Sequence, residues 1–172
     1  MTRLAMDECG GRNVAAFLDM IAYAEGTPRY SQNDGYDVLA GGKLFHSYAD
    51  HPRIKVKLRA DDLTTPRDES LSSTAAGRYQ FLVRTWDGLV AKLGRRVLPD
   101  FSPESQDRAA IELLKQRGAY SLIREGRVYE AINACRKEWA SLPGAGYGQR
   151  ELRAEALREV YVQAGGIVRG VA

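Results

Sequence analysis

The sequence changes character at Gly26 and again near Ser73, and this division limits the possible folds most strongly. Before Gly26, apolar residues recur at helical spacing. Residues 27–73 are rich in Pro, Gly, Asp and Ser, with short alternating apolar runs that are typical of turns and strands. After Ser73 the helical pattern returns. A short strand region between helical segments predicts an α+β protein, mainly helical, with a small antiparallel β-region and a cleft between the two parts.

Start and stop signals place the individual elements. Asn13 is expected to cap a helix that ends at about Glu25. Gly41 and Gly42 lie between two alternating runs, which predicts a β-hairpin. The other expected elements are a turn at 33–35, hairpin strands at 36–40 and 43–48, a strand or a lip of extended chain at 53–58, a mobile loop at 60–72, a loop at 141–148, and helices at 75–93 (capped by Thr74), 103–117, 119–125, 127–139 and 149–164.

Length and composition describe an ordinary globular chain. The 172 residues predict a single domain spanning 1–172, with a loose N-terminal tail over residues 1–12. A net charge of +3, with basic and acidic residues mixed, argues against a nucleic-acid partner. No apolar run is long enough for a membrane span, and the first residues form no secretory signal core. We therefore expect no stable membrane insertion.

Few residues are suited to metal ligation or redox chemistry. The two cysteines, Cys9 and Cys135, form no cysteine-rich motif, and their sequence does not show whether they pair. His46 and His51 lie five residues apart in an expected loop, which is a weak basis for a metal site. We expect no metal and no cofactor.

Glu25 is the strongest catalytic candidate. Val14, Leu18, Ile21 and Glu25 are spaced i, i+4, i+7 and i+11, so the carboxyl continues the apolar stripe of the first helix. It also lies at the helix C-terminus, where the helix dipole disfavours negative charge. Partial burial and this dipole both raise a carboxyl pKa, as a general acid for glycosidic cleavage requires. The alternative is a glutamate that only solvates a helix end.

Seven blocks of sequence resemble the phage lambda endolysin family. They occur in the family's order from about Ala15 to Gly166, nearly the whole chain. The blocks are residues 16–20 (AFLDM), 25–27 (EGT), 35–38 (GYDV), 50–53 (DHPR), 76–80 (AGRYQ), 100–103 (DFSP) and 139–149 (WASLPGAGYGQ). The segment from Arg53 to Ser70 is longer and more charged than its equivalent in the family, and the tail through Arg12 has no clear counterpart.

The resemblance implies a soluble lytic transglycosylase with a lysozyme-like α+β fold. Such enzymes cut the β-1,4 bond between N-acetylmuramic acid (MurNAc) and N-acetylglucosamine (GlcNAc) in bacterial peptidoglycan and leave a 1,6-anhydro-MurNAc end. The family's catalytic glutamate falls on Glu25. The resemblance also implies an enzyme that stays in the host cytoplasm until a holin opens the inner membrane and gives access to the periplasm and cell wall. We expect a monomer.

Aromatic residues are candidates for sugar contact because their flat faces pack on pyranose rings. Tyr36, Tyr48 and Tyr147 are expected to serve in this way, and the alternative is that each is half-buried core. Tyr147 has the best case because its glycine neighbours leave little apolar surface to bury it. Gln149 lies beside it on the expected cleft lip. Trp86 and Trp139 lie in helical apolar patterns and are expected in the core.

The block Gly77-Arg78-Tyr79-Gln80 is expected to line the cleft opposite the glutamate, as in similar lysozyme-like enzymes. Gln80 has both a donor and an acceptor for Glu25 or for a substrate acetamido group. Tyr79 is a candidate wall for a sugar ring, and Arg78 either binds substrate or pairs with an acid. The alternative for the whole block is a helix start with a packed tyrosine.

A second catalytic acid is not expected. Asp34 is explained as a turn former before Gly35. Asp37 faces either the cleft or solvent, and either aspartate is able to orient a sugar hydroxyl. The sequence leaves two alternatives to the transglycosylase, namely a lysozyme-type muramidase that hydrolyses the same bond and a non-catalytic wall-binding protein.

Overall fold

The computed structural model describes residues 2–57, 72–146 and 151–169. Over these residues the chain is mainly helical and carries a small antiparallel sheet, as the α+β prediction requires. The helices are α1 (Met6–Cys9), α2 (Arg12–Glu25), α3 (Val83–Leu93), α4 (Pro103–Gln116), α5 (Ala119–Arg124), α6 (Val128–Cys135) and α7 (Ala154–Gln163), with short 3-10 helices η1 (Thr27–Tyr30) and η2 (Ala40–Gly42). The strands are β1 (Val56–Lys57) and β2 (Ser72–Ser73).

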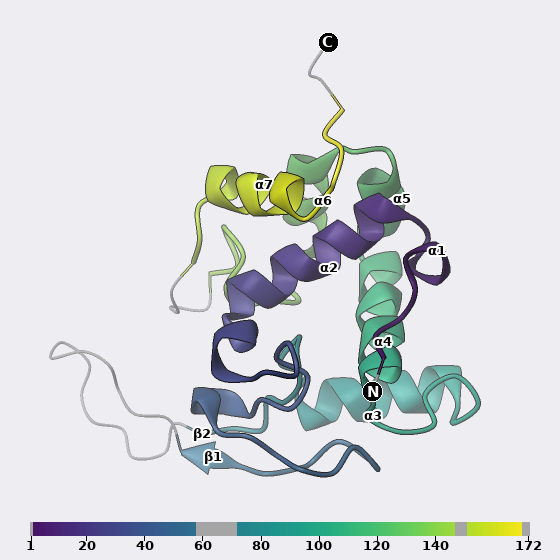
Figure 1. The fold of residues 1–172 in the computed structure, drawn as a ribbon, viewed down its shortest axis with the longest axis vertical. Coiled ribbons are helices and arrows are strands. Elements are labelled where there is room, and N and C mark those ends of the chain that lie inside the picture. Colours follow the sequence, from purple (N-terminus) through teal and green to yellow (C-terminus); the bar gives the residue numbers. More distant parts are fainter. Residues whose placement is uncertain (1, 58–71, 147–150, 170–172) are drawn as a thin grey trace, which may run out of the picture.

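Helix α2 is the central element. Figure 1 shows it crossing the middle of the molecule, with α6 and α7 on one side and the β-region on the other. It packs against α1, α4, α5 and α7. The predicted stripe of Val14, Leu18 and Ile21 is fully buried, and the helix ends at Glu25 where Gly26 adopts a left-handed φ of 71°. The end of this helix is therefore fixed by packing on several sides.

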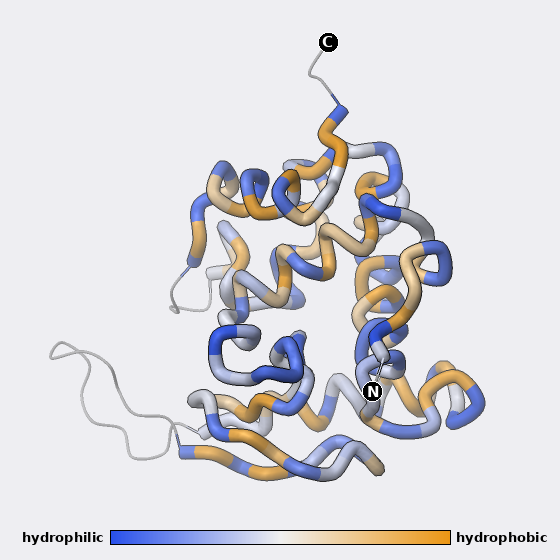
Figure 2. Tube along the Cα trace, viewed as in Figure 1, coloured by the Kyte–Doolittle hydropathy of each residue, from blue (hydrophilic) through white to orange (hydrophobic). Residues whose placement is uncertain are grey.

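Hydrophobic and hydrophilic residues alternate along the helices and gather in no single long run (Figure 2). This pattern is typical of amphipathic helices around a shared core. None of the helices in the described ranges has the length and apolar character that a membrane crossing needs.

The prediction of a loose N-terminal tail is wrong for the described part of it. Leu4 and Cys9 are buried, and Met6–Cys9 form α1. The Leu4 N–H donates to Asp107 Oδ2 at 3.0 Å, and Arg3 pairs with Asp19 at 2.8 Å. These contacts depend on residues far along the chain, so no local sequence pattern predicts them.

Two helix starts also differ from the prediction. Gly11, not Asn13, precedes the first residue of α2. The Asn13 side chain instead donates to the Arg124 carbonyl at 3.3 Å and accepts from the Ile167 N–H at 2.9 Å. Helix α3 begins at Val83, eight residues later than expected, because residues 76–81 form an antiparallel bridge and turn. Thr74 still contributes, since its Oγ1 accepts from the Val83 N–H at 3.3 Å.

The predicted hairpin is present in reduced form. Val38 and Leu44 form an antiparallel bridge around η2, and the Leu39 N–H donates to the Lys43 carbonyl at 2.7 Å. Within residues 53–58, expected to form a strand or an extended lip, Val56–Lys57 form β1, which pairs antiparallel with β2. Ser72, expected in a loop, belongs to β2. The rest of that expected loop, from 60 to 71, lies outside the described residues.

The C-terminal helices follow the prediction with shorter ends. Ser102 caps α4, as its Ser-Pro-Glu start indicates. The segment expected to be helical from 127 to 139 ends as α6 at Cys135. The last helix begins at Ala154 and not at 149.

Two neighbouring residues of α4 hold the β-region to the helices. Asp107, fully buried, accepts hydrogen bonds at one oxygen from the hydroxyls of Tyr36 (2.8 Å) and Tyr79 (2.6 Å). Gln106 accepts from the Arg78 N–H at 2.9 Å and donates to the Tyr36 carbonyl at 2.9 Å. A Cβ at Gly77 would lie 2.2 Å from Gln106 Oε1, so this close approach requires glycine.

We predict that Asp107→Asn destabilises the fold by about 2–3 kcal/mol, because one amide N–H₂ replaces an acceptor oxygen and confronts a buried donor. Urea denaturation measures the free energy of unfolding. Asp7→Asn, at an exposed position of α1, is the matched control and should change it by less than about 0.5 kcal/mol. Equal effects of the two substitutions would contradict the role given to Asp107.

Candidate active site

Glu25 lies half-buried at the C-terminal end of α2. The Ser141 hydroxyl donates to Glu25 Oε1 at 2.7 Å, and Ser141 is itself buried in the turn that follows Trp139. This bond joins two segments that are 116 residues apart. It holds the Glu25 carboxyl in a fixed position beside the turn that carries Ser141.

The surroundings of Glu25 favour its neutral form. Burial raises the pKa of the Glu25 carboxyl from 4.5 to about 7, while hydrogen bonds with Ser141 oppose the shift by stabilising the charge. Burial is the cause that the apolar stripe predicted. A carboxyl with a pKa near neutrality is able both to donate and to accept a proton at physiological pH.

Two cavities adjoin at Glu25, which lines both. The Gln80 cavity has a volume of about 640 Å³. Its described lining is Glu25, Ala40, Gly41, Ser73, Ala75, Gln80, Leu82, Thr85, Lys137, Glu138, Trp139 and Ala140. The Arg29 cavity has a volume of about 630 Å³. Its described lining is Tyr23, Ala24, Glu25, Gly26, Pro28, Arg29, Ser141 and Leu152.

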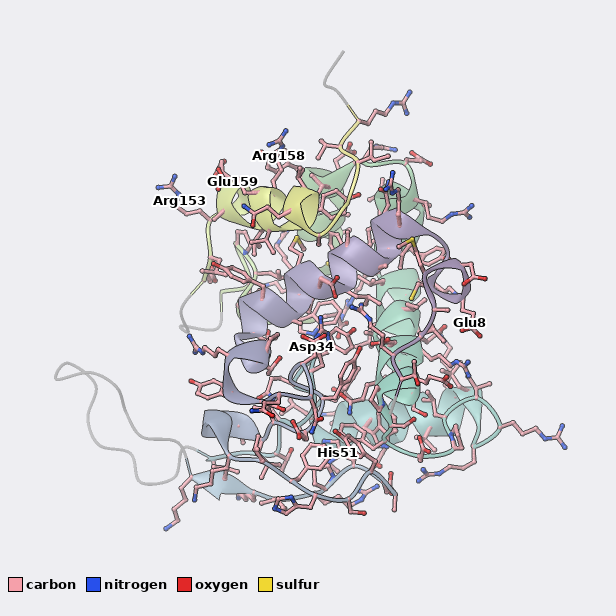
Figure 3. The ribbon with its side chains drawn as sticks, viewed as in Figure 1. Glu8, Asp34, His51, Arg153, Arg158 and Glu159 are labelled. Atoms are coloured by element: carbon pink, nitrogen blue, oxygen red, sulfur yellow. The ribbon has the colours of Figure 1, made fainter. Side chains whose placement is uncertain are left out.

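Glu25 has one other carboxylate beside it among the described lining residues. That residue is Glu138, whose carboxylate forms an ion pair with Arg117. Asp34 and Asp37 are engaged elsewhere: Asp34 pairs with Arg78, and the Asp37 carboxylate accepts from Ser31 and Asn33. Figure 3 shows Asp34 near the middle of the molecule, below α2.

Three of the predicted sugar-contact residues are interior residues. Tyr36, Arg78 and Tyr79 are only 1–3% exposed. Both tyrosine hydroxyls bind Asp107, and the Arg78 guanidinium pairs with Asp19 at 2.7 Å. Their side chains offer no exposed face to a sugar ring. We correct their role from substrate contact to support of the segment that carries Gln80.

Within the block 77–80, Gln80 is the residue that belongs to the described lining of the Gln80 cavity. Its Nε2 donates to the carbonyls of Val38 (3.2 Å) and Gly77 (3.0 Å). The expected bond to Glu25 is not formed, since Ser141 occupies that role. With the amide nitrogen held in this way, the amide oxygen is the group that Gln80 offers to a ligand.

Two of the remaining candidates lie away from the described cavity linings, and two lie outside the described residues. Tyr48 is half-buried and packs edge-on against Phe45, with ring centroids 5.4 Å apart, and burial raises the pKa of its hydroxyl to about 12. Asp37 is buried. Neither residue belongs to the described lining of the two cavities. Tyr147 and Gln149 lie outside the described residues.

Ser141, the partner of Glu25, was not among the residues that the sequence predicted for the site. Its position within the 139–149 block was the available signal, but a contact across 116 residues has no local pattern. Trp139 was expected in the core and is buried, with its Nε1 donating to the Tyr79 carbonyl at 3.1 Å. It also lines the Gln80 cavity, which the helical pattern did not indicate.

Comparison with known proteins decides the family. A family model described as Endolysin matches residues 15–168. The chain belongs to the endolysin family. It is 48% identical to the endolysin of Escherichia phage lambda over 159 residues, covering 91% of this chain and 93% of the relative. It is also 48% identical to the endolysin of Escherichia phage P2 over 163 residues, covering 91% and 94%.

The fold of this endolysin is lysozyme-like, as predicted. Its structure resembles that of bacteriophage lambda lysozyme complexed with a chitohexasaccharide, with a TM-score of 0.83 and 45% sequence identity. The match covers 98% of this chain and 100% of the other. A shorter match, 50% identical over 48 residues, is to a Staphylococcus epidermidis protein named "Probable transglycosylase SceD", covering 27% of this chain and 22% of that protein.

Ligands for a metal ion are not grouped in the described part of this endolysin. There, no three His, Cys, Asp or Glu side chains are placed together to hold one. Cys9 and Cys135 are buried free thiols.

We predict that Glu25→Gln stabilises the endolysin above pH 7 and has little effect near pH 4. A raised folded-state pKa means that the native state binds more protons than the unfolded state between pH 4.5 and 7, so stability falls as pH rises through this window. The neutral amide removes that penalty, which is at most about 3 kcal/mol. Thermal or urea unfolding at pH 4 and pH 8 measures it. A loss of stability at pH 8 would contradict the assignment.

Proposed function

We propose how this endolysin, a lysozyme-like enzyme acting on bacterial peptidoglycan, cleaves the glycan: as a lytic transglycosylase at the β-1,4 bond between MurNAc and GlcNAc. In the proposal Glu25 is the general acid and then the general base. The observation that carries it is a half-buried carboxyl with a pKa of about 7 at the meeting point of two cavities.

In the first step Glu25 donates its proton to the glycosidic oxygen, which leaves as the O4 hydroxyl of GlcNAc. The bond to MurNAc C1 breaks and an oxocarbenium-like centre develops, which the substrate's own N-acetyl group stabilises. A neutral carboxyl is needed here, and burial supplies it. The hydroxyl of Ser141 orients the carboxyl by holding Oε1.

In the second step the Glu25 carboxylate accepts the proton of the C6 hydroxyl of the same MurNAc. The C6 oxygen attacks C1 and closes a 1,6-anhydro ring, and Glu25 returns to its neutral form. No water is consumed. Because the nucleophile belongs to the substrate, its effective concentration is high and one carboxyl suffices for both proton transfers.

The carboxylates near Glu25 favour this mechanism over a two-carboxylate hydrolysis. Ordinary glycosidases place a second free carboxylate about 5–9 Å from the acid. The other carboxylate in the described lining, Glu138, is neutralised by Arg117. The partial match to a protein named as a transglycosylase points in the same direction. A muramidase that uses bound water is the alternative.

The biological setting in the proposal is phage-induced lysis. The enzyme waits in the host cytoplasm, gains the periplasm and cell wall when a holin opens the inner membrane, and acts as a monomer on glycan strands. The phage origin of its relatives supports this setting. The glycan partner is supported by a related lysozyme complexed with a chitohexasaccharide.

We predict that Glu25→Gln lowers the rate of cell-wall clearing at least about 100-fold, because the amide has no proton to donate. Turbidity of purified sacculi measures the rate, and a pelleting assay should show that wall binding is retained. Glu155→Gln, at an exposed position of α7, is the matched control and should clear walls at the wild-type rate. A Glu25→Gln variant that clears walls at the wild-type rate would contradict the role of Glu25 as the proton donor.

Mass spectrometry of the wild-type products separates the two catalytic accounts. A transglycosylase product ends in 1,6-anhydro-MurNAc, which lacks one water and is not reduced by borohydride. Products that borohydride reduces would identify a muramidase and overturn the transglycosylase proposal.

We also predict that Ser141→Ala moves the alkaline limb of kcat/KM to higher pH. In the wild type this limb should lie near pH 7, where Glu25 loses its proton. The Ser141 hydrogen bonds favour the carboxylate, so losing the side-chain bond raises the pKa of Glu25 further. The control is Ser121→Ala, at an exposed position of α5. An unchanged or lowered limb would contradict the role given to Ser141.

A further inference from the structure

The Arg29 cavity is lined by a positively charged side chain, that of Arg29, which has no part in the cleavage mechanism. Arg29 is exposed on η1, four residues after Glu25, and lines the same cavity as that carboxyl. Its guanidinium lies directly over the backbone of Gly26: a Cβ added there would be 3.1 Å from Cζ and Nη2 of Arg29. Because Gly26 has no side chain, the Arg29 guanidinium is able to lie beside the C-terminal end of α2.

The guanidinium is held in place by its own neighbours. Its Cζ lies 4.8 Å from the centre of the Tyr30 ring, which is cation–π distance. The Tyr30 ring in turn packs on Gly42, where an added Cβ would be 2.7 Å from Tyr30 Cε1. At the other end of η1, the Thr27 hydroxyl donates to the Arg78 carbonyl at 2.7 Å. Arg29 is thus presented on a turn anchored at both ends, which reduces the entropy lost on binding.

Arg29 differs from the arginines that serve the fold. Arg78, Arg117 and Arg127 each pair with a carboxylate of their own chain, whereas no carboxylate in the described ranges forms an ion pair with Arg29. The pKa of Glu25 is set by burial and by Ser141. The charge of Arg29 is therefore not used to stabilise the Glu25 carboxylate either. A guanidinium without an ion pair that lines the cavity of the catalytic carboxyl is available to bind an anionic group of a ligand there.

We propose that Arg29 binds a carboxylate of the stem peptide that MurNAc carries, and that the Arg29 cavity is the peptide subsite of this enzyme. The inference rests on the proposed function. In peptidoglycan the peptide is attached through the lactyl group of MurNAc, the sugar whose C1 is attacked, so the peptide must leave the glycan close to Glu25. The peptide carries free carboxylates, and a bare chitin-type glycan carries none.

The shape and lining of the cavity fit a short peptide. Its volume of about 630 Å³ is in the range that holds a ligand of several residues. The ring of Tyr23, 54% exposed, and Pro28 give it an apolar wall, on which small peptide side chains pack. One cation against an apolar wall selects an anionic peptide over an uncharged glycan extension.

The test compares two forms of one substrate. Purified, soluble peptidoglycan strands are used as isolated, and after carbodiimide coupling with excess methylamine has converted the stem carboxylates to methylamides. The glycan is the same in both. We expect the wild type to lose about fivefold to tenfold in kcat/KM on the methylamide form, mainly through KM, because one charge-assisted contact is lost.

Arg29→Gln should lose a similar factor on the unmodified strands and be insensitive to methylamidation, since the contact is already absent. Arg29→Lys should restore part of the loss. Arg158→Gln removes the same charge from α7, where Figure 3 shows Arg158 projecting away from the rest of the molecule. This control should match the wild type on both substrates.

Two outcomes would overturn the inference. In the first, Arg29→Gln equals the wild type on unmodified strands; in the second, it loses the same factor on both forms and so retains the full sensitivity to methylamidation. The last result would assign Arg29 to the glycan or to the fold, and thermal unfolding would distinguish these. Failure of the wild type to cleave either form would instead refute the proposed function.

Discussion

The hydrogen bond between Ser141 and Glu25 is the contact on which the site depends. Burial at the end of α2 pushes the carboxyl toward its neutral form, and the Ser141 hydroxyl limits that shift so that the pKa settles at about 7. Deeper burial without the bond would raise the pKa further and make the protonated carboxyl a weaker proton donor. Fuller exposure would leave a carboxylate without a proton to give.

Other parts of the fold serve to keep this end of α2 beside a cleft. Gln106 and Asp107 of α4 hold the chain at Tyr36 and at residues 77–79, and Trp139 binds the Tyr79 carbonyl. These contacts place Gln80 and Trp139 in the lining of the Gln80 cavity. The polar residues buried behind the site are therefore its supports, and η1 extends the site on the other side of Glu25 with Arg29.

Features written in local sequence could be predicted, and features that depend on distant contacts could not. The stripe ending at Glu25 and the Ser102-Pro103 start of α4 are local and were placed correctly. The start of α3 was missed because pairing between Ala76 and Phe81 overrides helical spacing. The sequence predicts that Tyr36 and Tyr79 contact sugar rings. In the structure their hydroxyls donate to the buried carboxylate of Asp107, so both rings lie in the interior. The N-terminal residues have no local signal of an ordered structure, but the Leu4 N–H donates to the same aspartate.

A direct titration of Glu25 tests the central claim, which is that this carboxyl is poised between acid and base at neutral pH. Carbon-13 NMR of selectively labelled glutamate, assigned by comparison with Glu25→Gln, follows its ionisation in the intact enzyme. The account predicts a midpoint near pH 7. A midpoint near 4.5, the ordinary value for a glutamate, would mean that Glu25 is ionised at working pH and is not the proton donor.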